Sequence, residues 1–105
     1  ILLFDTMPLK TRLDADLKDA MRAKDAATLR TLRAVKAALL LAETAEGRQG
    51  LPLTEAEELA VLQRQQKQRK DSLEQFTASG RADLAASEQE ELAVLERYLP
   101  QQLSA

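Results

Sequence analysis

The sequence predicts an all-α protein, a small multihelical bundle of about four helices whose third helix is long and partly polar. The first observation is composition: the 105 residues are rich in Leu and Ala but include only three Val and one Ile. Leu, Ala, Glu, Lys, Gln and Arg favour helices, whereas strands favour β-branched residues. The second is periodicity, because apolar residues recur at spacings of three and four along most of the chain.

The first half of the chain predicts two helices and a loop. The first helix is expected over about residues 9–24, with one face formed by Leu13, Leu17, Ala20, Met21 and Lys24. Asp25 is expected to cap the second helix by accepting hydrogen bonds from its free amides, and that helix is expected to reach about Glu46. Its apolar positions are Leu29, Leu32, Val35, Leu39 and Ala42. Two Gly and one Pro within residues 47–52 then predict a loop.

The second half predicts two further helices. Thr54 and Glu57 have the spacing of a capping box, so a helix is expected to begin there. It is expected to continue to about Ser79, where Gly80 supplies a left-handed C-terminal stop. The fourth helix is expected over about residues 82–99 and is followed by Pro100, which cannot continue a helix. Its anchoring residues are Leu84, Leu92, Leu95 and Tyr98.

The middle of the third predicted helix is polar. Leu59 and Leu62 begin its apolar face and Leu73 and Phe76 end it, but residues 63–72 include no apolar side chain. Continuing the spacing places Gln66 and Arg69 at core positions. The favoured interpretation is that these long side chains lie over their neighbours with their polar ends in water. The alternative is that the polar section is a contact surface.

Several classes of chemistry are excluded by what the chain lacks. Without Cys or His it has no disulfide, no thiolate nucleophile, no His base and no His- or Cys-ligated metal. The loop at residues 47–50 lacks the spacing of a phosphate-binding P-loop. Glu88, Glu90 and Glu91 are expected to be solvated acids on a helix. We therefore predict no catalytic residue, no metal and no cofactor.

The charges are unevenly distributed, although the formal net charge is only −2. Residues 10–36 include eight basic and four acidic side chains, whereas the fourth predicted helix is acidic. The candidate phosphate contacts are basic side chains in and just after the third predicted helix: Arg64, Lys67, Arg69, Lys70 and Arg81. A charge run on a helix is more often a solvated face, and no aromatic residue lies within this run to stack on bases.

Spaced motifs in this same region carry a family resemblance. The order K-x-R-K, EQF, GR-x-DL, E-x-E-E-L-x-x-L and YLP-x-QLS, from Lys67 to Ser104, resembles the GatB/YqeY family of small, all-helical bacterial proteins. The segment from Thr31 to Ala38 is similar to the second helix of that family. The resemblance implies a helical domain at residues 7–99. Met7-Pro8-Leu9 looks like a native start, so residues 1–6 are expected to be upstream or added sequence. Residues 100–105 are expected to begin a linker to a C-terminal helical subdomain that this chain does not include.

The resemblance also implies a function. The domain recurs as the tail of the B subunit of the tRNA-dependent amidotransferase, where it is associated with holding tRNA. We therefore expect a non-catalytic helical module that assists the binding of tRNA or of a tRNA-dependent enzyme. The alternative is an adaptor that binds a partner protein. A third possibility is a carbon–nitrogen ligase with glutamine as amido-N-donor, the activity with which stand-alone members are labelled.

The cellular location and the oligomeric state are predicted from weaker signals. No run of about 18 apolar residues is present, so no membrane partner is expected. The expected location is the cytoplasm. Four amphipathic helices can close one core alone or share a core with a second copy, so the sequence leaves the oligomeric state open.

Overall fold

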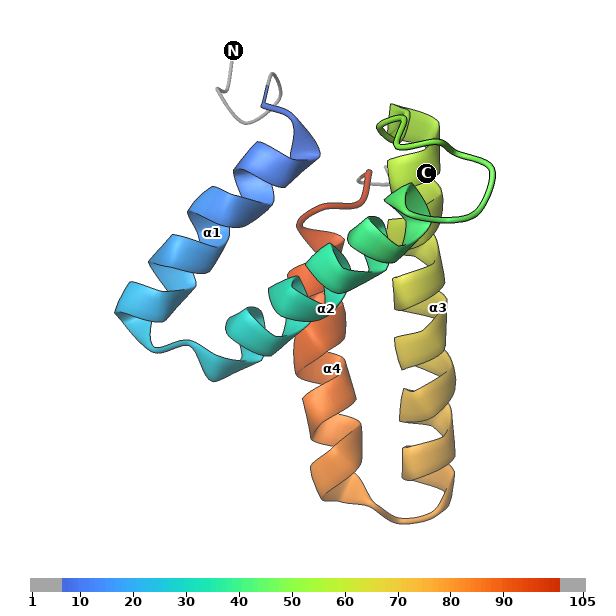
Figure 1. Cartoon of the computed structure of the whole chain (residues 1–105). Coiled ribbons are helices and arrows are strands. Elements are labelled where there is room, and N and C mark those ends of the chain that lie inside the picture. The colour runs from blue at the N-terminus through green and yellow to red at the C-terminus, as the bar shows by residue number, and fades with distance from the viewer. Residues whose placement is uncertain (1–6, 101–105) are drawn as a thin grey trace. The chain divides into compact units, whose positions relative to one another are not determined.

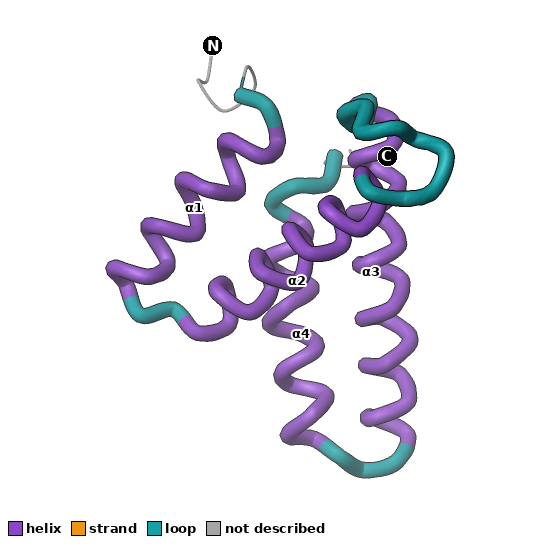
Figure 2. Tube along the Cα trace, in the orientation of Figure 1, coloured by secondary structure: helices purple, strands orange, loops and turns teal. Residues whose placement is uncertain are grey.

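The computed structural model describes residues 7–100, which form four helices and no strand (Figure 1). In chain order these are α1 (Leu9–Ala23), α2 (Ala26–Glu43), α3 (Glu55–Ala78) and α4 (Ala82–Glu96), as Figure 2 shows. The prediction of an all-α fold with four helices is confirmed. The expectations for residues 1–6 and for 101–105 lie outside the described residues.

The chain divides between Pro52 and Leu53 into two compact units. The first unit includes α1 and α2, and the second includes α3 and α4, so each unit contains a pair of consecutive helices. That residues 7–99 form one domain stays a prediction.

A two-residue turn joins the helices of the first unit. Lys24 takes the left-handed conformation with φ 57°. The Asp25 amide donates to the Ala20 carbonyl at 2.9 Å and the Lys24 amide donates to Met21 at 3.2 Å, which together form a Schellman motif. The Asp25 carboxylate then accepts from the amide of Thr28 at 3.2 Å and from its hydroxyl at 2.6 Å. One residue thus ends α1 and caps α2, which confirms the predicted role of Asp25.

The core of the first unit lies on the predicted faces of both helices. Its buried apolar side chains are Leu13, Ala20, Leu32, Val35 and Leu39. Two predicted members of the α1 face are wrong: Met21 is 58% exposed, and Lys24 lies beyond the helix. Thr28 and Thr31 are also buried. The Thr31 hydroxyl donates to the Ala27 carbonyl at 2.7 Å, so burial leaves it satisfied.

α2 ends three residues before the predicted Glu46. The Thr44 amide and hydroxyl both donate to the Leu40 carbonyl, at 3.0 and 2.9 Å, and this closes the last turn. Gly47 and Gly50 follow with φ 92° and 77°, which are conformations that L side chains rarely adopt. The loop predicted for residues 47–52 is confirmed.

Both predicted ends of α3 are confirmed. The Glu57 amide donates to the Thr54 hydroxyl at 3.1 Å, and the Thr54 amide donates to the Glu57 carboxylate at 2.9 Å, which completes the capping box. At the other end Gly80 has φ 76°. The Arg81 amide donates to the Phe76 carbonyl at 2.9 Å in a second Schellman motif.

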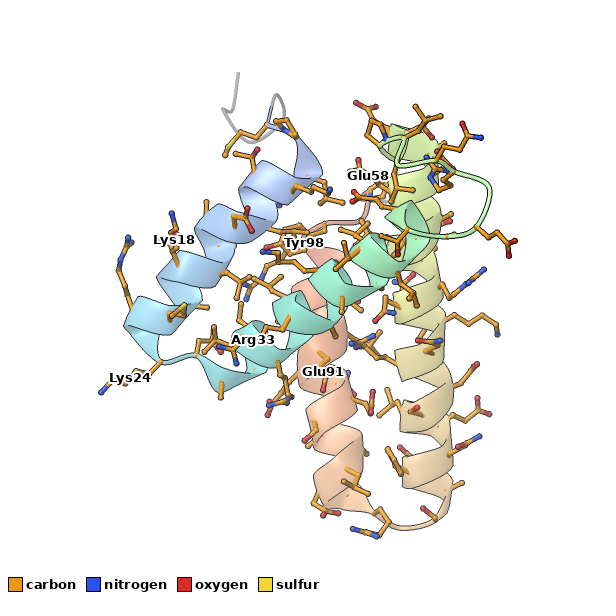
Figure 3. All side chains as sticks on the ribbon, viewed as in Figure 1. Lys18, Lys24, Arg33, Glu58, Glu91 and Tyr98 are labelled. Carbon is orange, nitrogen blue, oxygen red and sulfur yellow. The ribbon has the colours of Figure 1, made fainter. Side chains whose placement is uncertain are left out.

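The core of the second unit lies mainly on α4. Its buried apolar side chains are Leu62, Leu92, Val94, Leu95 and Tyr98. α4 ends at Glu96 rather than at the predicted Leu99, because the chain tightens after it: the Tyr98 amide donates to Leu95 at 2.9 Å. Figure 3 shows Tyr98, the predicted packing anchor, directly after this helix.

Candidate functional site

Three of the five candidate phosphate contacts lie on one side of α3. Arg64, Lys67 and Lys70 are all exposed. Because an α-helix has 3.6 residues per turn, these three residues cover an arc of about 120° of the helix surface. Arg69 lies about 140° from Arg64 in the other direction around the helix axis. We call Arg64, Lys67 and Lys70 the basic face of α3.

Arg69 is not part of this basic face. Its side chain is only 10% exposed, and its Nε donates to an oxygen of Glu91 on α4, itself 17% exposed, at 3.0 Å. A second guanidinium nitrogen donates to the Gln65 side-chain oxygen at 2.6 Å and to the Gln65 carbonyl at 3.1 Å. The guanidinium group therefore faces α4 and is held within the protein.

Two sequence interpretations are corrected by this contact. Arg69 does occupy the core position that its spacing indicates, but its polar end is not in water. Glu91, expected to be a solvated acid, is the partner of Arg69 (Figure 3 shows Glu91 on α4). The physical reason is that a guanidinium group removed from water needs a charged, hydrogen-bonded partner. An arginine at a core position with an acid on the facing helix is the signal that could have indicated the pair.

The three cations of the basic face differ in their partners. Lys67 lies 3.5 Å from the Asp71 carboxylate one turn later, with side chains 78% and 57% exposed. A solvated pair of this kind holds the ammonium group weakly, by about 0.2–0.5 kcal/mol. The side chains of Arg64 and Lys70 make no ion pair or hydrogen bond with any other residue in the range 7–100. Their charges are thus available to an external anion.

Arg81 lies apart from the basic face, in the turn between α3 and α4. Its guanidinium group reaches both Asp83 carboxylate oxygens at 3.4 Å. This hydrogen bonding from Arg81, with a further contribution from the Leu84 amide, lowers the pKa of Asp83 below its ordinary value of 3.8. Arg81 is exposed, but its charge is already shared with a neighbouring acid.

The chemistry of the region is that of ammonium and guanidinium groups on a helix surface, which bind anionic oxygens. Across residues 7–100, no set of three or more Asp, Glu, His or Cys side chains is grouped so that it could hold a metal ion. No described helix combines the length and apolar character needed to cross a membrane.

Comparison with known proteins adds one finding. The model of the family described as Yqey-like protein matches residues 10–105, which confirms the resemblance seen in the sequence motifs. A search of curated proteins found no significant match.

Proposed function

Because the chain belongs to the Yqey-like protein family, we propose that it is a cytoplasmic, non-catalytic helical module that assists the binding of tRNA or of a tRNA-dependent enzyme. One observation carries the proposal: Arg64 and Lys70 on the basic face of α3 are exposed and have no partner among the described residues. The family resemblance to the tail of the amidotransferase B subunit supports tRNA as the anion.

The burial of Arg69 limits the strength of such binding. The contact is left to Arg64, Lys67 and Lys70, with Arg81 as a weaker candidate because Asp83 holds it. Three phosphate contacts give a slope of log affinity against log salt of about −2 to −3. The chain has a net charge of −2, so its overall field does not attract a polyanion, and binding depends on the local basic face.

The test is a fluorescence-anisotropy titration of labelled bulk bacterial tRNA at low and physiological salt. The variant Lys67→Glu/Lys70→Glu reverses two charges on α3. Its control is Lys18→Glu/Lys24→Glu, which reverses two exposed lysines of the first unit and gives the same net charge.

We expect saturable binding by the wild type and by the control, and a loss of at least about tenfold in the α3 variant, or 1.4 kcal/mol. No binding at low salt, or an equal loss in both variants, would contradict the proposal. Ammonia release from glutamine would instead favour the carbon–nitrogen ligase.

A second candidate function, a docking module for a partner protein, is favoured by a separate observation. Leu40 and Leu41 on α2 are 60% and 74% exposed. Two large adjacent apolar side chains gain nothing from contact with phosphates, so they indicate a different kind of partner.

A further inference from the structure

Two acidic side chains lie within the arc of the basic face of α3. Because an α-helix turns by about 100° per residue, Asp71 lies about 20° from Arg64 around the helix axis, and Glu74 lies about 20° from Lys67. Both acids are exposed. The basic face is therefore bounded by negative charge at its C-terminal end, on the stretch of α3 that leads to the turn at Gly80.

The two acids differ in what they contact. The Lys67 ammonium group donates to an Asp71 carboxylate oxygen at 3.5 Å, and both side chains are exposed. The Glu74 side chain follows Lys70 by the same four residues, but it makes no ion pair or hydrogen bond with any other residue in the described range. Asp71 thus occupies the position of an anion on Lys67, whereas Glu74 is a neighbouring charge only.

A phosphate oxygen and a carboxylate oxygen compete for the same ammonium group. Lysine has three donors and no acceptor, and it forms charge-assisted hydrogen bonds with either kind of anion. A phosphate bound to Lys67 would also lie within a Debye length of the Asp71 carboxylate, about 10 Å at 0.1 M salt, so the two anions would repel each other. Both effects lower the affinity for phosphate, and both come from the same carboxylate.

We propose that Asp71 is an attenuating residue of the anion site on the basic face: its carboxylate competes with phosphate for the Lys67 ammonium group and so weakens tRNA binding. This inference rests on the proposed function and concerns the regulation of the same site. Both members of the pair belong to one helix, so the contact depends on α3 alone. The consequence is a complex that dissociates more readily, because affinity differences between related complexes lie mostly in the dissociation rate.

The test applies the tRNA anisotropy titration to the full chain with Asp71→Asn. The control is Asp19→Asn on α1, because Asp19 is likewise exposed and paired, 3.0 Å from Arg22, and its replacement changes the net charge equally. Glu74→Gln measures the effect of a nearby charge that holds no lysine. Asp71→Glu keeps the carboxylate, so its affinity should stay close to that of the wild type.

We expect Asp71→Asn to bind tRNA about threefold more tightly at low salt. The gain should shrink at physiological salt, because screening weakens the repulsion. Asp19→Asn should change the affinity less than about 1.5-fold, and Glu74→Gln should give a smaller gain than Asp71→Asn. In the Lys67→Met background the gain should largely disappear, because the ammonium group for which the carboxylate competes is gone. Circular dichroism should show unchanged helix content, since these side chains are exposed.

Two results would overturn the inference and leave the proposed function intact. In the first, the wild type binds tRNA but Asp71→Asn binds no more tightly than Asp19→Asn. In the second, the gain is equalled by Glu74→Gln or persists undiminished in the Lys67→Met background, which would indicate a general effect of charge. Absence of tRNA binding by both the wild type and Asp71→Asn would instead contradict the proposed function, and this inference with it.

Discussion

Replacing Arg69 with Met should destabilise the second unit far more than the loss of a surface lysine on the same helix. Arg69→Met removes the guanidinium group that donates to the Glu91 carboxylate at 3.0 Å in a part-buried setting. It also removes two hydrogen bonds to Gln65, at 2.6 and 3.1 Å. The Glu91 side chain is only 17% exposed, so its carboxylate cannot regain full hydration.

The magnitude follows from the burial of the pair. Removing one member of a buried ion pair costs about 3–5 kcal/mol. Because Glu91 keeps some contact with water, we expect the lower end, about 3 kcal/mol, a large fraction of the total stability of a small protein. The double variant Arg69→Met/Glu91→Leu replaces both charges with apolar side chains, so its free energy of unfolding should return to within about 1 kcal/mol of wild type or exceed it.

Urea unfolding monitored by tyrosine fluorescence measures this directly. The chain has one Tyr and no Trp, and Tyr98 is buried in the second unit, so the signal reports that unit. A loss of 3 kcal/mol corresponds to a midpoint lower by about 1–3 M urea. The control Lys67→Met removes only the exposed pair with Asp71 and should change stability by less than about 0.5 kcal/mol. If Arg69→Met costs no more than this control, or the double variant does not recover, the assignment of a buried pair is refuted.

Three further predictions concern local contacts. Lys24→Gly should raise the free energy of unfolding by about 0.5–1 kcal/mol. A left-handed conformation strains Lys but not Gly, and the relief of that strain exceeds the entropic cost of Gly. A lower melting temperature in thermal denaturation would argue against the left-handed turn. Thr54→Ala should lower stability by about 1 kcal/mol through loss of the capping box, and an unchanged melting curve would mean that the box contributes nothing. The Lys36 ammonium group donates a hydrogen bond to the Asp14 carboxylate, and this lowers the pKa of Asp14 below 3.8. The contact therefore stabilises the fold at pH values above the unfolded-state pKa of Asp14, and this stabilisation is lost as the pH falls through the folded-state pKa. Carbon-13 NMR titration should show that pKa rising in Lys36→Met, and an unchanged value would remove Lys36 as its cause.

Local signals account for what the sequence predicts well. Asp25, Thr54 and Gly80 act on amides and carbonyls within a few residues, so their roles follow from spacing alone. The ends of α2 and α4 are less predictable, because helical propensity continues beyond the residues at which tighter hydrogen bonds close each helix. The left-handed turn at Lys24 carries no sequence signal, since Gly would be the expected residue there.

The candidate site was harder to predict because it depends on which side of α3 faces α4. Sequence proximity groups Arg69 with Lys67 and Lys70, yet the helix rotation between neighbours directs it toward Glu91, 22 residues later. That partner follows only from the register of two packed helices. The exposure of Leu40 and Leu41 on α2 is hidden in a similar way, because the apolar run around Leu39 does not reveal which of its leucines face water.

Lysine footprinting in the presence of tRNA would test the central claim most directly. The chain is treated with an amine-acetylating reagent, with and without saturating tRNA, and the modification of each lysine is quantified by mass spectrometry. Contact through the basic face of α3 predicts that Lys67 and Lys70 become protected while Lys18 and Lys24 remain as reactive as before. Unchanged reactivity at Lys67 and Lys70 in the bound state would contradict the account.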